Sequence, residues 1–259
     1  MLNPDGKIIV VTGGASGIGA ACAEVLAKEG NRVVVADLNM ALAREVAARI
    51  GGHAWAIDVA EIDSVENAAS GIEEKIGPVY GLVNSAGIIQ KPLEPHKLDM
   101  DTWDLVQRVD FRGTYVCCLA FGRAMLTRKS GSIVNISSVT GYRSVPLHSY
   151  APAKAAVISM TQCLAAEWGP SKVRVNSVAP GYTMTPALKA AIERGERSVD
   201  RLIANAPMQD TVQPSQIGDA VSFLLSDRAG AITGIDLPVD CGWLAGTSWN
   251  TYGGFRFAS

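Results

Sequence analysis

The sequence Lys7-Ile-Ile-Val-Val-Thr12 runs directly into Gly13-Gly-Ala-Ser-Gly-Ile-Gly19. The first stretch is short, apolar and rich in β-branched residues, so it predicts a buried strand. Residues 17–29 carry apolar side chains at helical spacing, and Gly30 stands where a helix would end. A glycine-rich loop between a strand and a helix brings backbone N–H groups and a helix dipole to a pyrophosphate. The opening of the chain therefore predicts a dinucleotide-binding βαβ unit.

The alternation of strand and helix continues through the chain. Apolar runs predict strands at 32–36, 54–57, 81–83, 132–136, 174–178 and 235–239. Helical spacing predicts helices at 42–50, 62–76, 101–128, 149–168 and 214–226. Strands that are apolar on both faces are typical of a parallel sheet covered by helices on both sides. We expect an α/β, doubly wound, Rossmann-type fold in which residues 1–259 form a single catalytic domain.

Composition excludes several classes of protein. With 48% hydrophobic and 19% charged residues the chain is not disordered, and a net charge of −2 leaves no basic excess for nucleic acid. The five cysteines form no C-x-x-C pair and the three histidines are isolated from one another, so no metal site is expected. No run reaches the roughly 18 apolar residues of a membrane span. We expect a cytoplasmic protein with no membrane or nucleic-acid partner.

Polar residues at strand ends indicate the kind of dinucleotide. Asp37 ends the second predicted strand, where a carboxylate accepts hydrogen bonds from both hydroxyls of an adenosine ribose and repels a 2′-phosphate. No Arg or Lys stands at 14–16, 38 or 39 to hold such a phosphate, so the sequence favours NAD over NADP. The alternative is that Asp37 only caps the next helix.

Other candidate cofactor residues follow the same logic, because ligands of such sheets bind at the carboxyl ends of strands. Asp58 and Val59 are suited to an adenine ring, and the small residues after the fourth strand let a ligand lie against the backbone. The candidates in these segments are Gly13, Ser16, Gly17, Ile18, Gly19, Asp58, Val59, Asn84, Ala86 and Gly87.

Acid–base chemistry is indicated by Tyr150 and Lys154, four residues apart on one face of a predicted helix. A free tyrosine has a pKa near ~10, and a lysine cation together with a positive nicotinamide ring would stabilise the tyrosinate. Ser138 follows the fifth predicted strand, at the same sheet edge as the cofactor residues, where its hydroxyl could hold a substrate oxygen.

Together these motifs resemble the short-chain dehydrogenase/reductase family, from about Lys7 to Trp243. The resemblance rests on the glycine loop, Asn84-Ser-Ala-Gly87, Ser138, Tyr150-x-x-x-Lys154, Pro180-Gly-Tyr-Thr-Met-Thr185 and Asp240-Cys-Gly242. It implies a seven-stranded parallel sheet in the order 3-2-1-4-5-6-7. It also implies hydride exchange between a nicotinamide and an alcohol or carbonyl.

The resemblance implies a role for each site residue. Tyr150 is the general acid/base, Lys154 lowers its pKa and binds the nicotinamide ribose, and Ser138 polarises the substrate oxygen. Around the nicotinamide it implies Pro180, Gly181, Thr183 and Thr185. Asp110 stands where the family usually has an Asn that holds a water in a proton relay, so an Asp there adds a charge near Lys154.

Substrate contacts are less specified by the sequence. Residues 186–210 are expected to form a loop over the pocket, and Gln90, Thr140, His148 and Tyr182 are expected beside the implied active site. The tail, residues 243–259, carries Trp243, Trp249, Tyr252, Phe255 and Phe257, so we expect it to dock rather than to lie free in water. The resemblance implies a homotetramer whose tails meet across a two-fold axis.

These observations predict an NAD-dependent dehydrogenase of a secondary alcohol, acting on a polyol, sugar or other small hydroxy compound. One alternative is a 3-ketoacyl- or steroid-type carbonyl reductase, which Asp37 disfavours because such reductases usually prefer NADPH. An alternative of another class is a non-catalytic NAD-binding regulator, which Ser138, Tyr150 and Lys154 disfavour.

Overall fold

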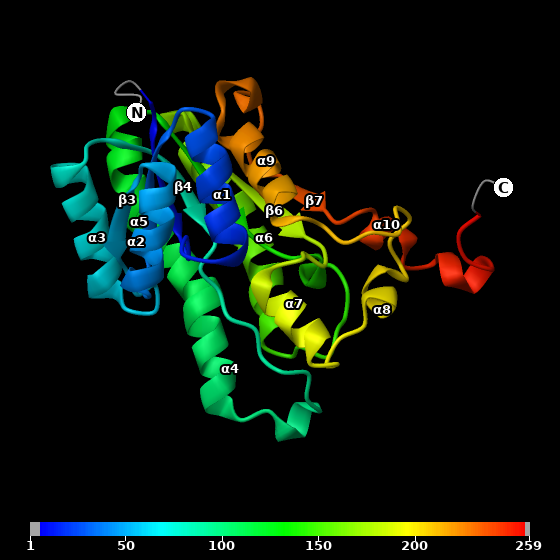
Figure 1. Cartoon of the computed structure of the whole chain (residues 1–259). Coiled ribbons are helices and arrows are strands. Elements are labelled where there is room, and N and C mark those ends of the chain that lie inside the picture. The colour runs from blue at the N-terminus through cyan, green and yellow to red at the C-terminus, as the bar shows by residue number, and fades with distance from the viewer. Residues whose placement is uncertain (1–5, 257–259) are drawn as a thin grey trace.

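The computed structural model describes residues 6–256, and its centre is one seven-stranded sheet whose strands are all parallel (Figure 1). The strands are β1 (Ile8–Thr12), β2 (Arg32–Asp37), β3 (His53–Ala56), β4 (Val79–Asn84), β5 (Gly131–Ile136), β6 (Val173–Pro180) and β7 (Asp236–Val239). Their order is β3-β2-β1-β4-β5-β6-β7, which confirms the doubly wound fold and the strand order that the resemblance implied. The chain reverses direction across the sheet after β3, so β4 pairs with β1 on the side opposite β2.

Helices connect the strands and cover both faces of the sheet. They are α1 (Gly17–Lys28), α2 (Met40–Ile50), α3 (Ile62–Lys75), α4 (Met100–Val106), α5 (Thr114–Arg128), α6 (Tyr150–Trp168), α7 (Pro186–Glu193), α8 (Val199–Ile203), α9 (Pro214–Leu225) and α10 (Trp243–Gly246). Short 3₁₀ turns are η1 (Pro95–Lys97), η3 (Val139–Gly141), η4 (Gly169–Ser171), η5 (Asp227–Ala229) and η6 (Trp249–Tyr252). The π-helical segment η2 (Gln107–Gly113) joins α4 to α5.

The alternation of side chains along β1 divides the core between the two faces. Ile8 and Val10 join one apolar cluster with α3, α5 and α6, while Ile9 and Val11 join the other with α1, α2 and α9. All four side chains are buried, as expected for a strand covered by helices on both sides.

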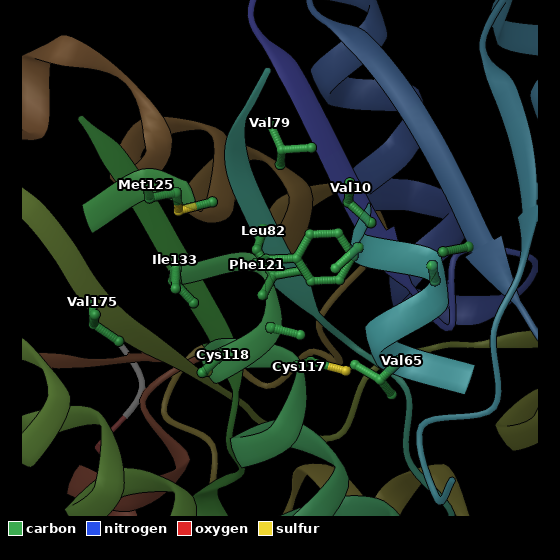
Figure 2. Packing of buried hydrophobic residues seen from close by; sticks show 14 of the residues in the cluster. Val10, Val65, Val79, Leu82, Cys117, Cys118, Phe121, Met125, Ile133 and Val175 are labelled. Atoms are coloured by element: carbon green, nitrogen blue, oxygen red, sulfur yellow. The ribbon is translucent and has the colours of Figure 1, made fainter. Parts of the chain in front are cut away.

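Phe121 of α5 lies at the centre of the first cluster. In Figure 2 its ring lies among labelled side chains of β1 and β4, with Met125 and Ile133 nearby. Phe121 is 1% exposed, so α5 is fixed against the sheet just beyond the π-helical segment.

Two segments differ from the sequence prediction. The single helix predicted over 101–128 is α4, η2 and α5, because a π-helical turn interrupts the regular spacing. Residues 186–210 were expected to be less regular, and they contain the short helices α7 and α8. Thr185 caps α7, with its hydroxyl accepting a hydrogen bond from the Leu188 N–H at 3.3 Å.

The tail leaves the sheet and ends far from it, at the right of Figure 1. Trp243 is buried and meets Tyr182 edge-on, whereas Trp249 packs against Phe255 and Tyr252 is 83% exposed. Phe257 lies outside the described residues. No helix within residues 6–256 is both long enough and apolar enough to cross a membrane.

Candidate active site

The glycine loop is packed against the chain segment that follows β4. A Cβ on Gly13 would lie 2.6 Å from Cα of Ala86, and Gly13 has a φ of +62°. A Cβ on Gly19 would overlap the carbonyl oxygen of Gly13. Both glycines are therefore required for the close backbone approach that makes a phosphate cradle.

The N-terminus of α1 suits an anion. Ser16 stands at the N-cap but its side chain does not cap the helix, and the first turn carries no acidic residue. The first backbone N–H groups of a helix point outward with the positive end of the dipole. This end of α1 fits the pyrophosphate of a dinucleotide, as the loop sequence predicted.

Asp37 is held rigidly at the end of β2. Its Oδ2 accepts a hydrogen bond from the Ala15 N–H at 3.0 Å, and its Oδ1 accepts one from the Asn39 N–H at 2.8 Å. Asn39, not Asp37, caps α2, because the Asn39 side chain accepts from the Leu42 N–H. The alternative role of Asp37 as the cap of the next helix is therefore wrong, and its carboxylate lies against the glycine loop instead.

Asn84 is used differently from the other strand-end residues. Its Nδ2 donates to Oδ1 of Asn135 at 2.9 Å and its side chain is buried. The Asn135 side chain in turn donates to Thr161 at 2.9 Å. Asn84 thus joins β4, β5 and α6 beneath the site through its Nδ2, while its buried Oδ1 has no hydrogen-bond partner among residues 6–256.

Lys154 lies beside the candidate catalytic side chains of Asp110 and Tyr150. Its Nζ donates to the carbonyl oxygen of Ile136 at 3.1 Å, lies 3.1 Å from Oδ2 of Asp110 and stands 5.3 Å from the centre of the Tyr150 ring. Lys154 is 4% exposed and Asp110 0%. The pair is thus a buried ion pair that adjoins the tyrosine.

Asp110 reaches Lys154 because of two local features. It lies in the π-helical segment η2, a kind of turn that often occurs at functional sites. A Cβ on Gly87 would stand 2.9 Å from its Oδ2, so only glycine leaves room for the carboxylate there. Asp110 Oδ1 accepts a hydrogen bond from the Ile88 N–H at 2.8 Å, which fixes the carboxylate's orientation.

Neighbouring groups shift the pKa of Tyr150 in opposite directions. Burial raises the pKa of Tyr150; the Lys154 cation and the Ser138 hydroxyl lower it, and the Asp110 carboxylate raises it again. The net direction is upward, so Lys154 lowers the pKa of Tyr150 as expected but does not outweigh burial and Asp110 by itself. For Asp110, burial raises the pKa more than Lys154 lowers it. For Lys154, burial lowers the pKa, but Asp110 and Tyr150 together raise it by more, so the pKa of Lys154 is raised on balance.

These residues line a cleft of about 590 Å³, a size typical of cofactor and small-ligand sites. It brings together the following predicted site residues: Gly13, Ser16, Gly17, Ile18, Gly19, Asp37, Asp58, Val59, Ala86, Gly87, Asp110, Tyr150, Lys154 and Thr185. The glycine cradle and the open helix end fit the pyrophosphate of NAD or NADP, and the fixed carboxylate fits the hydroxyls of an adenosine ribose. Within residues 6–256 no group of three or more His, Cys, Asp or Glu side chains is placed to hold a metal.

Other predicted residues do not line this cleft. Ser138 is buried at the start of η3, where its Oγ accepts from the Thr140 N–H at 3.2 Å. His148 lines a separate hollow with Pro146 and Leu93, and Tyr182 packs on Trp243. For the cofactor, Pro180, Gly181 and Thr183 stay predictions, as do Ser138, Thr140, His148 and Tyr182 for the substrate.

Several lining residues were not singled out from the sequence. Apolar side chains of Leu38, Ile57, Ile88, Ile89, Val109 and Ile136 contribute to the cleft, beside Ser85 of the Asn84–Gly87 motif and Pro186 and Ala187 of the loop expected over the pocket. Most of them are next to a predicted polar residue, and that adjacency is the only signal that could have indicated them.

Comparisons with known proteins place this geometry in a family. Residues 13–244 match the family model described as enoyl-(acyl carrier protein) reductase. The chain is 38% identical to D-threitol dehydrogenase of Mycolicibacterium smegmatis, covering 92% of this chain and 93% of that one. It is 37% identical to galactitol 2-dehydrogenase of Rhizobium johnstonii, covering 95% and 96%.

Solved structures are also similar. One titled ribose-5-phosphate isomerase from Brucella melitensis 16M has a TM-score of 0.95 at 50% identity and covers 98% of both chains. Another, titled short chain dehydrogenase/reductase family protein, has a TM-score of 0.83 at 35% identity and covers 95% of this chain and 100% of that one. The fold, the cleft and these matches agree, and the chain belongs to the short-chain dehydrogenase/reductase family of oxidoreductases.

Proposed function

We propose that this protein oxidises a secondary hydroxyl of a polyol or sugar alcohol with NAD. The observation that carries the proposal is the common cleft of Tyr150, Lys154 and Asp110 with the glycine loop and Asp37. The names of the threitol and galactitol dehydrogenases support the substrate class. The fixed Asp37 carboxylate supports NAD over NADP, because the residue that follows it is the exposed Leu38 and not a basic residue that could pair with a 2′-phosphate.

In the proposed reaction Tyr150 takes the proton from the substrate hydroxyl while the carbinol carbon loses its hydride. When bound, the nicotinamide supplies the acceptor for that hydride. The Ser138 hydroxyl holds the substrate oxygen near the tyrosine. Lys154 holds its charge beside the ring of Tyr150, and Asp110 keeps the lysine cationic in a buried place.

Cofactor binding is expected to activate the base. Burial leaves the pKa of Tyr150 raised in the protein itself, despite Lys154. A cation brought next to the phenol favours its ionised form. The oxidised nicotinamide ring carries such a charge, so Tyr150 is expected to be a more effective base once NAD has bound.

A redox-neutral alternative, aldose–ketose isomerisation, is suggested by the name of the Brucella structure, ribose-5-phosphate isomerase. An aldose–ketose isomerase needs an acid and a base but no dinucleotide. The cradle could hold the phosphate of a sugar phosphate, but Asp37, fixed at the end of β2 where it suits an adenosine ribose, has no role in such a reaction. The cleft therefore favours the oxidoreductase.

The test is a screen of the purified protein with NAD or NADP against polyols, sugars, hydroxy acids and aryl alcohols. The expected result is NADH absorbance with polyols, and Tyr150→Phe is the matched inactive control. D-Ribose 5-phosphate is included without cofactor. Conversion of it to its ketose, with no turnover of any alcohol, would reject the proposed function.

We also propose that residues 1–259 act as one catalytic domain, in a cytoplasmic homotetramer. The five cysteines are free thiols, the state favoured by a reducing compartment. The exposed aromatic side chains of the tail support association with further copies of the chain.

A further inference from the structure

One buried polar side chain, Gln90, belongs to none of the motifs above. It lies in the connection between β4 and η1, where every other residue from Gly87 to Lys97 is exposed. Gln90 itself is 6% exposed. Because the connection has no regular secondary structure of its own here, a packing role within a helix or strand does not explain this burial.

The oxygen of Gln90 accepts two hydrogen bonds at the start of α6. The Ser149 N–H donates to Gln90 Oε1 at 2.8 Å, and the Tyr150 N–H donates to the same atom at 3.0 Å. Only the oxygen of an amide can accept, so these two bonds also fix which way the side chain is turned.

These bonds complete the first turn of α6. The Ala151 N–H donates to the carbonyl of Leu147 at 3.0 Å, and Pro152 has no N–H to satisfy. Ser149, at the N-cap, makes no capping bond with its own side chain. The two donors that the helix cannot satisfy by itself are therefore those that Gln90 satisfies, one of them on Tyr150.

A second glutamine holds Ser149 from another segment. Gln107 Nε2, in η2, donates to the Ser149 carbonyl oxygen at 2.8 Å and to its Oγ at 3.1 Å. The Ser149 hydroxyl donates to the carbonyl of Trp103 at 2.8 Å, and Ser149 is 0% exposed. Ser149, the residue before Tyr150, is thus held by the connection after β4, through Gln90, and by η2, the segment that carries Asp110.

Stability alone does not account for Gln90. Its Nε2 is buried with no hydrogen-bond partner among residues 6–256, and such an unmade bond destabilises a fold. An apolar side chain of similar size would avoid that penalty but would leave the Ser149 and Tyr150 N–H groups unpaired. The side chain therefore serves the start of α6 through its oxygen.

We propose that Gln90, with Gln107, is a positioning residue that sets the place of the Tyr150 side chain by fixing Ser149 and the first turn of α6. The inference rests on the proposed function only in assigning the base to Tyr150. Because proton transfer depends steeply on distance, a shift of this turn acts on the catalytic step more than on binding.

Gln90→Met removes the acceptor at nearly constant volume, and Gln90→Glu keeps an oxygen acceptor. In Gln90→Met we expect kcat to fall about 10- to 100-fold, the order of loss from a misplaced catalytic group, with NAD affinity unchanged. Gln90→Glu is expected to recover most of the rate at the plateau of its pH profile. If Gln90→Met does not fold, Gln107→Met tests the same positioning role, because it removes the hydrogen bonds that hold Ser149 from η2.

The matched control is Gln216→Met. Gln216 Oε1 also accepts a backbone hydrogen bond at a helix start, from the Gln213 N–H at 2.8 Å, but at α9, which contributes no residue to the cleft lining. A purely structural effect predicts that kcat falls in either variant only as far as its folded fraction falls. The proposal predicts a loss of kcat for Gln90→Met alone.

Hydrogen exchange of the Ser149 and Tyr150 amides gives a readout without substrate. Exchange is expected to be faster in Gln90→Met and unchanged in Gln90→Glu and Gln216→Met. If exchange is faster in Gln90→Met but the wild-type protein oxidises no alcohol, the proposed function is rejected, while the role of Gln90 in holding the first turn of α6 is supported. Unchanged exchange, unchanged kcat, or a rise in KM alone would each overturn the positioning role.

Discussion

The Nζ atom of Lys154 lies 3.1 Å from Oδ2 of Asp110, in a pair that is almost fully buried. A charged pair in such a place is costly to desolvate, so its presence at a lysine proposed to act in catalysis calls for a functional account. The same carboxylate raises the pKa of the neighbouring Tyr150. Asp110 therefore keeps Lys154 cationic, and it offsets part of the lowering of the Tyr150 pKa that the lysine cation causes.

Replacing Asp110 with Asn is expected to shift the pH profile. Removal of the carboxylate lowers the pKa of Tyr150, because the charge that opposes the tyrosinate is lost. In the direction of alcohol oxidation the base form is needed, so the acidic limb of kcat/KM should move to lower pH. The measurement is initial NADH formation across pH, with Asp227→Asn, a remote ion-pair carboxylate, as control. A limb that stays in place or moves upward contradicts this account.

Replacing Tyr150 with Phe should abolish most turnover and leave the cofactor site intact. The loss expected for a general acid/base is about 10²- to 10⁴-fold in kcat. NAD contacts the glycine loop and Asp37 in the proposed mode, so its dissociation constant, measured by fluorescence titration, should change little. Tyr115→Phe, on the exposed face of α5, is the control. A kcat within a few fold of the wild type would remove Tyr150 from the mechanism.

The fold and much of the cleft could be predicted from the sequence, because local residue patterns determine both. The apolar strands and the Gly13–Gly19 loop predict the βαβ order, and the carboxyl ends of parallel strands necessarily share one edge. What it could not predict depends on contacts between distant segments. The π-helical turn at Asp110 has no periodic signature, and Gln90 meets Tyr150 across 60 positions of chain. The pKa of Tyr150 depends on burial, which adjacency in sequence does not report.

Gly13→Ala should destabilise the protein more than Gly51→Ala. Both glycines have positive φ, +62° and +66°, so each substitution carries roughly 1–2 kcal/mol of backbone strain. A Cβ at Gly51 meets nothing within 4 Å, whereas one at Gly13 would stand 2.6 Å from Cα of Ala86. Overpacking of that kind costs about 1–3 kcal/mol more. Free energies of unfolding from urea titration give the comparison, and equal losses would show that the loop relaxes freely.

The exposed tail predicts assembly. Tyr252 is 83% exposed and Trp249 47%, so their burial against another copy would remove apolar surface from water. Light scattering should give a mass four times that of the 27.2 kDa chain. Trp249→Ser with Tyr252→Ser should lower that mass, while Leu42→Ser, an exposed apolar residue of α2, should not. A monomer mass for the wild type would reject the tetramer.

Cofactor choice should depend on Asp37 and on the residue after it. Asp37→Ala removes a charge-assisted acceptor for the ribose, a loss of about 1.5–3 kcal/mol, or roughly 10- to 100-fold in kcat/KM with NAD. Leu38 is 74% exposed beside the cleft, so Leu38→Arg adds a guanidinium able to pair with a 2′-phosphate. The double variant should therefore prefer NADP. Rates with both cofactors, at one polyol concentration, measure the change, and Leu42→Arg on the adjacent α2 controls for added charge. If NAD stays the better cofactor of the double variant, selectivity resides elsewhere in the cleft than at the end of β2.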